Sequence, residues 1–247
     1  MSSILDCTAH RLWPLPSRPW IMAQSWHDLL FAHWEIDAAK LRPHIPAQLE
    51  IDTFEGKAWL GIVPFRMSGV RLRWTPALPW LSAFPELNVR TYVTTQGKPG
   101  VWFFSLDAAN AAAVIAARLS FHLPYFRARM TCSEVDGWTQ YKSERTHPDA
   151  PAASFEGRYR PAGEHFEPQP GTLAHFLTER YCLYAAAGQG IYRGEIHHPV
   201  WRLHPAEVEF TRNSMSEAAN LAVSVEKHLL HFARRQDMVA WAPQRIA

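Results

Sequence analysis

Hydrophobic and polar positions alternate with a period of two along several stretches of the chain, the pattern of β-strands with one buried face. Three pairs of these stretches flank a short turn that contains glycine, so each pair predicts an antiparallel hairpin. The paired stretches are 86–93 with 101–107, 126–134 with 138–145, and 180–187 with 191–198. Further strands are expected at 57–67, 154–160, 206–212, 225–232 and 22–36, although the last also fits a helix.

Helical signals are fewer. Short helices are expected at 38–42, 108–120 and 172–179, of which the alanine-rich 108–120 is the clearest. Asp37 is a suitable N-cap for the first helix, and Asp107 or Asn110 for the second. Many hairpins with few helices predict an α+β fold, a curved antiparallel β-barrel-like sheet that hides its edges. No linker divides the chain, so residues 1–247 are expected to form a single domain.

The composition is that of a folded protein with a sizeable core. Of the 247 residues, 47% are hydrophobic and 19% are charged, and a net charge of +2 argues against a nucleic-acid partner. No apolar stretch of about 18 residues predicts a membrane span, and the first residues do not resemble a secretory signal. Cys7, Cys132 and Cys182 are widely spaced, as is typical of free thiols in a reducing compartment. A cytoplasmic location is therefore expected.

Motifs of the common enzyme classes are absent from the sequence. It contains no G-x-S-x-G, no H-E-x-x-H and no phosphate-binding Walker motif, and the glycine-rich run 188–194 has the wrong spacing for a dinucleotide fingerprint. No cofactor and no metal site are therefore expected. Glu195 and His197 share one face of a predicted strand, but a metal needs more ligands at one point. Whether this pair joins a functional site is left open.

The strand predicted at 86–93 carries the strongest signal for a functional site. Alternation places Glu86, Asn88, Arg90 and Tyr92 on one face, and Leu87, Val89, Thr91 and Val93 on the other. The polar row either faces water or lines an internal cavity. In a cavity, the arginine fork suits a carboxylate or phosphate, and the glutamate suits a base or an anchor.

This strand belongs to a set of sequence blocks that resemble a known family. The blocks are LSAFPELNVRTYV, GKPGVWFFSLDAAN, ARLSFHLPYFRARM, WHDLLFAHWEID, IDTFEGKAWLGIVPFRM, GTLAHFLTERYCLYA, EIHHPVW and LLHFARRQDMVAW. Together they resemble the YqjF-like family of uncharacterised bacterial proteins over residues 19–243. That family is similar to the acetoacetate decarboxylase-like superfamily. The resemblance implies a cone-like antiparallel barrel around a small-molecule cavity, and no established activity.

The resemblance also carries expectations for single residues. The decarboxylases place a Schiff-base lysine just after a helix and a proline, whereas Pro124 is followed here by Tyr125 and Phe126. A Schiff base needs a primary amine, so no Schiff-base catalysis is expected. Glu86 is the counterpart of a glutamate on a barrel strand of those enzymes. Asp107 stands where they have an acidic residue before the helix, and we interpret it as the helix N-cap.

Three hypotheses for the function follow. In the first, a barrel cavity binds a small polar or anionic organic molecule. The ligand-binding residues would be Arg90, Asn88, Trp102, Phe104 and Tyr125, the last three as possible apolar walls. The alternative is an acid–base enzyme (an isomerase, hydratase or lyase) acting on a small carbonyl or carboxylate compound. In it Glu86 is the base, Arg90 holds the anion, and Tyr92 or His122 donates a proton. The third is a structural or interaction protein with a filled core. The sequence does not indicate an oligomeric state.

Overall fold

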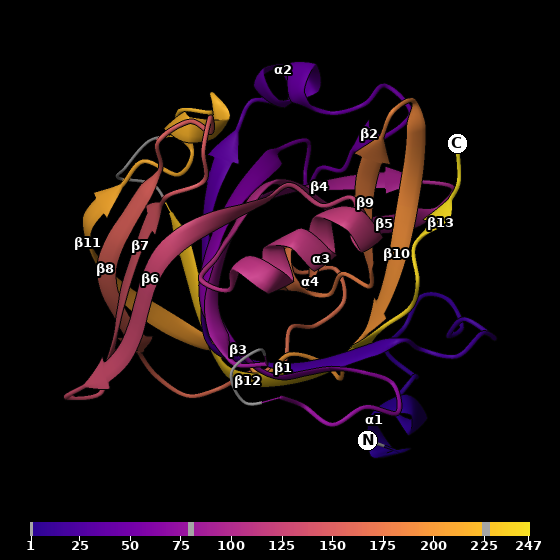
Figure 1. Ribbon diagram of the computed structural model, residues 1–247, viewed down its shortest axis with the longest axis horizontal. Coiled ribbons are helices and arrows are strands. Elements are labelled where there is room, and N and C mark those ends of the chain that lie inside the picture. The colour runs from indigo at the N-terminus through magenta and orange to yellow at the C-terminus, as the bar shows by residue number, and fades with distance from the viewer. Residues whose placement is uncertain (1, 79–81, 224–227) are drawn as a thin grey trace.

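The computed structural model describes residues 2–78, 82–223 and 228–247 (Figure 1). The first strands are β1 (Met22–Ile36), β2 (Glu50–Ile51), β3 (Ala58–Leu72), β4 (Phe84–Thr95), β5 (Lys98–Ala108), β6 (Tyr125–Val135) and β7 (Trp138–Arg145). The others are β8 (Ser154–Pro161), β9 (Cys182–Ala187), β10 (Gly190–His197), β11 (His204–Asn213), β12 (Leu229–Ala240) and β13 (Gln244–Arg245). The helices are α1 (Ser2–Asp6), α2 (Ala38–Leu41), α3 (Ala111–Phe121) and α4 (Leu173–Thr178), with 3₁₀ turns at Arg42–His44 and Glu217–Ala219.

The strands close into two rings that share one wall. The first ring runs through β12, β1, β3, β4, β5, β9 and β10, and it closes where β10 pairs with β12. The second ring leaves β5 through β6, β7, β8 and β11 and returns to β12. Most neighbouring strands pair antiparallel, while β5 pairs parallel with both β6 and β9. The curved, barrel-like α+β fold expected from the hairpins is therefore confirmed.

The shared wall is buried on both faces. Leu87 and Val89 of β4 are fully buried and pack with Tyr141, Phe155 and Tyr159 of the second ring in one hydrophobic core. The side chains of the opposite face point into the first ring, because alternate residues of a strand point to opposite sides. The two rings thus divide the alternating residues of β4 between a packed core and the interior of the first ring.

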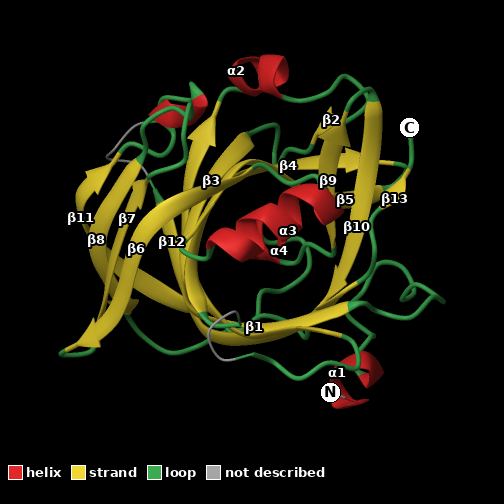
Figure 2. Cartoon of the chain, viewed as in Figure 1, coloured by secondary structure: helices red, strands yellow, loops and turns green. Residues whose placement is uncertain are grey.

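Helix α3 lies across the open end of the first ring (Figure 2). The helix begins after Asn110, whose side chain accepts hydrogen bonds from the backbone N–H groups of Ala112 and Ala113. The expected N-cap at Asp107 is wrong, because Asp107 and Ala108 complete strand β5 and the helix begins three residues later than expected. Asp107 instead forms a buried ion pair with Arg145.

The remaining predicted elements agree with the alternation pattern, although β3, β4 and β12 extend beyond the predicted ranges. The three predicted hairpins are confirmed, and 22–36 is a strand. The strand expected at 225–232 is partly outside the described residues, since 224–227 are not described, and β12 continues to Ala240. Cys7, Cys132 and Cys182 are unpaired, as expected. No helix in the described part of the chain is long and apolar enough to cross a membrane.

Candidate functional site

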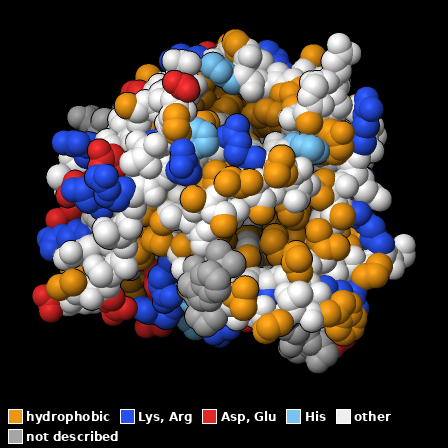
Figure 3. Space-filling view, viewed as in Figure 1, with side chains coloured by type: hydrophobic (Ala, Val, Ile, Leu, Met, Phe, Trp, Pro, Cys, Tyr) orange, Lys and Arg blue, Asp and Glu red, His pale blue; other side chains and the backbone are white. Residues whose placement is uncertain are grey.

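A cavity of about 530 Å³ occupies the first ring beneath α3. In the space-filling view of this face, apolar side chains surround a hollow at the centre of the ring (Figure 3). Most of the lining is apolar and comes from the inward faces of the strands and from α3. It includes Met22, Trp26, Leu29, Phe31, Val63, Phe65, Met67, Phe103, Leu106, Ala113, Ala117, Phe121, Leu183, Trp201 and Met238. Such a volume with such walls is typical of sites for small organic molecules.

Three polar side chains of β4 line this cavity in a row: Glu86, Asn88 and Arg90. Strand alternation points them inward, because the opposite row of β4 is buried in the core of the second ring. Phe84, at the start of β4, pairs with Met67 near the end of β3, where the loop at the mouth begins. The row therefore runs from Glu86 near the mouth to Arg90 at the floor.

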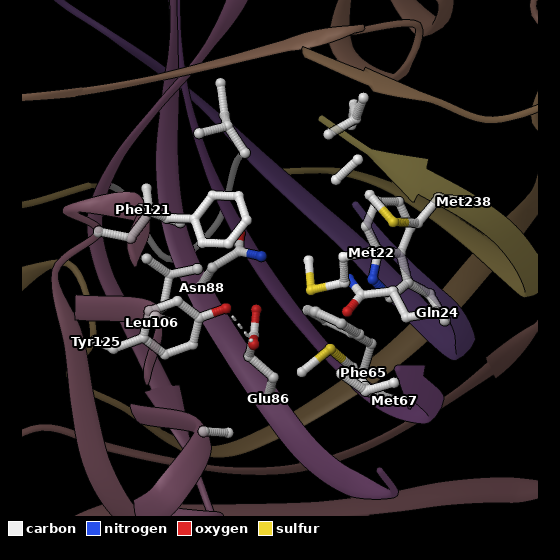
Figure 4. A pocket seen from close by; sticks show the side chains of 18 of the residues that line it. Met22, Gln24, Phe65, Met67, Glu86, Asn88, Leu106, Phe121, Tyr125 and Met238 are labelled. Carbon is white, nitrogen blue, oxygen red and sulfur yellow. Dashed lines mark hydrogen bonds between the residues drawn. The ribbon is translucent and has the colours of Figure 1, made fainter. Parts of the chain in front are cut away.

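Glu86 is almost fully buried and accepts a hydrogen bond of 2.8 Å from the Tyr125 hydroxyl. Figure 4 shows its carboxyl group directed into the cavity between Tyr125 on one side and Met67 and Gln24 on the other. Burial raises the pKa of Glu86 to about 8, and the nearby Asp107 carboxylate adds to the rise. Glu86 is therefore mostly protonated at pH 7, so it can donate a hydrogen bond or a proton to a bound molecule.

Asn88 follows Glu86 towards the floor. The residue is 5% exposed, and its Oδ1 atom has no hydrogen-bond partner among the residues of the structure. A buried polar atom without a partner costs free energy, and a donor group on a bound molecule would remove that cost.

Arg90 places a cation at the floor of the cavity. Its Nη2 atom donates to the Leu177 carbonyl oxygen at 3.3 Å and lies 3.5 Å from the Tyr92 hydroxyl oxygen. Its guanidinium carbon lies 5.3 Å from the ring centre of Phe31. Nε is buried without a partner, and no acidic side chain in the described ranges forms an ion pair with Arg90. The guanidinium retains capacity for an anion.

A second arginine, Arg180, also lines the cavity. It pairs with Asp52, and its guanidinium carbon lies 4.8 Å from the ring centre of Tyr92. Burial lowers the pKa of Arg180, and Asp52 opposes that effect. Asp52 therefore compensates the charge of Arg180, whereas no carboxylate of the described residues pairs with Arg90.

Tyr92 lies beneath the floor and does not line the cavity. Its hydroxyl donates to the Leu177 carbonyl oxygen at 2.8 Å, so the Nε2–H of His33 donates to the Tyr92 oxygen at 2.6 Å. Burial and the charge of Arg90 hold the pKa of His33 well below its usual range, so His33 is neutral. Tyr92 does not fit the expected role of proton donor, because its hydroxyl already donates its proton to the Leu177 carbonyl oxygen.

Three other expected site residues lie elsewhere. Trp102 and Phe104 pack against the hydrophobic core on the opposite face of β5, and Phe103 lines the cavity in their place. His122 ends α3 in a left-handed conformation, with φ at 56°, and its ring lies 4.6 Å from that of Tyr192. None of these three side chains belongs to the cavity lining, in contrast to the arrangement expected from the sequence. Tyr125 lines the cavity, and its hydroxyl donates a hydrogen bond to Glu86.

Glu195 and His197 lie outside the cavity lining. Glu195 pairs with Lys98 at 2.8 Å and accepts from the Trp13 indole at 3.1 Å. His197 Nε2 lies 2.7 Å from the Ile4 carbonyl oxygen. Both therefore attach the N-terminal segment to β10. No group of three or more His, Cys, Asp or Glu in the described residues is arranged to hold a metal ion.

Sequence reasoning missed several polar residues of the lining, notably Gln24, Thr178, Arg180 and His198. Burial lowers the pKa of His198 to about 4, so it is neutral at pH 7. Arg180 is the first residue of the strand predicted at 180–187, and its charge beside an apolar run was the available signal. Nothing in the local pattern of the other three distinguishes an inward from an outward position.

The chain resembles known proteins over most of its length. Residues 23–237 match the DUF2071 family, described as an uncharacterised conserved protein. The chain is 43% identical over 227 residues to the uncharacterised protein YqjF of Bacillus subtilis strain 168, covering 92% of this chain and 93% of that protein. The family resemblance drawn from the sequence is thereby confirmed.

Solved structures share the fold at low sequence identity. The enduracididine biosynthesis enzyme MppR, complexed with pyruvate, superposes with a TM-score of 0.64 at 10% identity, covering 96% of this chain and 93% of that one. An acetoacetate decarboxylase from Legionella pneumophila superposes with a TM-score of 0.61 at 12% identity, covering 99% and 95%. At these identities the likeness concerns the fold alone, which is the acetoacetate decarboxylase-like fold expected from the sequence.

Proposed function

We propose that this chain, which belongs to the DUF2071 family, binds a small organic carboxylate inside the first ring. The carboxylate binds to Arg90 at the floor, and the rest of the ligand contacts the apolar walls. Asn88 and protonated Glu86 line the path between Arg90 and the mouth, where they are available to a further polar atom of a ligand that has one. No Schiff base is involved.

The observation that carries this proposal is the Arg90 guanidinium. It lines the mostly apolar cavity, has a buried Nε without a partner, and pairs with no carboxylate of the described residues. A partly buried charge without a counter-ion is costly, and the planar guanidinium matches a carboxylate geometrically. The pyruvate in the complex of the similarly folded MppR is also a carboxylate, which is compatible with this ligand class.

The proposal is tested by calorimetric titration of the protein with butyrate, hexanoate and octanoate at pH 7.5. Arg90→Met should weaken the binding of all three acids at least tenfold, because the neutral side chain offers the carboxylate no charge. Arg90→Lys keeps the charge and loses the fork, so it should weaken binding by roughly 1–3 kcal/mol. Arg129→Met is the matched control, because Arg129 is a surface residue with a 78% exposed side chain. Binding that is absent in the wild type, or unchanged in Arg90→Met, would reject the proposal.

Acid–base catalysis in the same cavity is the second candidate, and the protonated Glu86 favours it. A carboxyl group with a pKa of about 8 is close to the value that suits proton transfer near neutral pH. Keto and hydroxy acids incubated in deuterium oxide should then exchange hydrogen for deuterium at a carbon next to the carbonyl or hydroxyl carbon. Glu86→Gln should slow the exchange by on the order of 100-fold or more. The surface variant Glu144→Gln is the control, and exchange that persists in Glu86→Gln excludes this role.

The third hypothesis, a filled core, does not fit an interior with a cavity of about 530 Å³. Protein interiors pack with few voids larger than a water molecule, so an open space of this size calls for an occupant.

A further inference from the structure

We infer that the carboxylate ligand is an amphiphile, with its head group on Arg90 and an unbranched apolar chain that extends along the cavity towards α3. This inference rests on the proposed function, and it specifies the chemical class of the molecule bound there. It is carried by the length of the cavity, the chemistry of its walls and the character of its mouth.

The length follows from the register of β4. Arg90 at the floor and Glu86 nearer the mouth are four residues apart on one strand, which corresponds to about 13 Å between their Cα atoms. A bulge between Val89 and Arg90 shortens this only slightly. A three- or four-carbon acid held by Arg90 would leave the space nearer the mouth unfilled, whereas an extended chain would occupy it.

The walls along this path suit methylene groups. Beyond Asn88 the lining includes Met22, Met67, Leu106 and Met238, and α3 contributes small alanine side chains. Methionine adapts its shape to flexible apolar ligands. Glu86 is the acidic group in this stretch of the described lining, and as a protonated group it places no charge beside an apolar chain.

The mouth of the cavity exposes large apolar side chains on both of its sides. Ile115 and Leu119 on the outer face of α3 are 59% and 74% exposed. Leu72, the last residue of β3, is 60% exposed, and Trp74, just after that strand, is 87% exposed. The sequence contains no Asp or Glu from 56 to 85 or from 108 to 133. These apolar side chains would contact the chain of an anionic amphiphile as it enters, and no acidic residue of these two segments would repel its head group.

The test is a chain-length series by calorimetry at pH 7.5: acetate, butyrate, hexanoate, octanoate and decanoate, each below its micelle concentration. Affinity should rise about threefold to fourfold for each added methylene until the chain fills the cavity, and then level off. Octan-1-ol and octylamine test the head group, and both should bind at least tenfold more weakly than octanoate.

Two variants test separately the contacts of the apolar chain and those of the carboxylate. Ala117→Leu fills space beneath α3 and should weaken decanoate at least tenfold while leaving butyrate unchanged. Ala111→Leu, on the same helix but outside the lining, is its control. Arg90→Met should reduce octanoate to the affinity of octan-1-ol.

The outcomes distinguish the proposed function from the inference that the ligand is an amphiphile. If no carboxylate binds, the proposed function fails. If all carboxylates bind with similar affinity and still depend on Arg90, the proposed function stands and the amphiphile inference is overturned. A steep rise with chain length that stops in Ala117→Leu supports both.

Discussion

Glu86 links the chemistry of the cavity to the stability of the fold. Its pKa is about 8 in the folded protein, against 4.5 in an unfolded chain. Between these values the folded state holds a proton that the unfolded state releases. The contribution of Glu86 to the free energy of unfolding is therefore largest below pH 4.5 and is lost as pH rises to about 8.

We expect the free energy of unfolding to fall by up to about 1.4 kcal/mol per pH unit through this window because of Glu86. In Glu86→Gln the amide carries no titrating proton, so this part of the slope should vanish. Urea denaturation at pH 5, 6, 7 and 8 measures the difference between variant and wild type. The surface variant Glu144→Gln should keep the wild-type slope. A wild-type slope in Glu86→Gln would mean that Glu86 is ionised in the folded protein.

Gly61 makes room for the residues beneath the cavity floor. It lies between His33 and Arg90 across three neighbouring strands. A Cβ atom there would lie 3.1 Å from the His33 ring and 3.3 Å from Arg90 Cγ. Glycine therefore allows both side chains to lean over β3.

Gly61→Ala should displace the guanidinium and lower the free energy of unfolding by about 1–3 kcal/mol. Octanoate affinity should fall in the fraction that remains folded, which titration calorimetry measures. Gly190→Ala is the control, since its new methyl group would lie 3.0 Å from Arg245 Nε and 3.3 Å from the Tyr192 ring, and neither residue lines the cavity. Unchanged affinity in Gly61→Ala would show that Arg90 does not need its present position.

At the scale of single elements, α3 covers the cavity and depends on its N-cap. Asn110 Oδ1 accepts from Ala112 N and Ala113 N, both at 3.1 Å. Asn110→Ala should cost about 1 kcal/mol of stability and increase hydrogen exchange over 111–121, while Asn110→Asp should preserve both. Mass-spectrometric hydrogen exchange reports the helix directly. If Asn110→Ala exchanges like the wild type, the cap contributes nothing to the helix.

Strand β4 could be predicted from sequence and strand β5 only in part. In β4 the polar and apolar rows differ, so alternation identifies which residues share a face. In β5 the run VWFF is apolar on both faces, so periodicity does not indicate which face points into the cavity. A bulge adds to the difficulty: Val89 pairs with Ser105 and Arg90 with Phe103, so Phe104 is the extra residue. The bulge changes the phase of the strand, which brings Phe103 and Leu106 to the same face.

At the scale of the whole molecule, the barrel-like sheet was predictable and the shared wall was not. Hairpins are local, and their turn sequences identify them. The closure of two rings depends on pairings between distant segments, such as β1 with β12 and β10 with β12. Those pairings bring Arg180 and His198 to the same cavity as Arg90. No local pattern shows that these residues meet, so most of the polar lining could not be named from sequence.

The distribution of lysines over the molecule leads to the last prediction, that no imine forms with a β-keto acid. No lysine lines the cavity within the described residues. Lys57, Lys98 and Lys142 pair with carboxylates at 2.7, 2.8 and 3.0 Å, and the contact with Glu35 raises the pKa of Lys57. An ammonium group that is held in an ion pair is a poor nucleophile. Lys40 is exposed, and Lys227 lies outside the described residues.

Borohydride reduction in the presence of acetoacetate, followed by intact-mass measurement, should therefore leave the mass of the chain unchanged. An acetoacetate decarboxylase treated in parallel is the positive control, because such enzymes share the fold and carry a Schiff-base lysine. A stoichiometric adduct would contradict the prediction, and peptide mapping would then identify the lysine. An unchanged mass together with Arg90-dependent carboxylate binding would mean that this barrel holds its ligand by charge and shape, without a covalent bond.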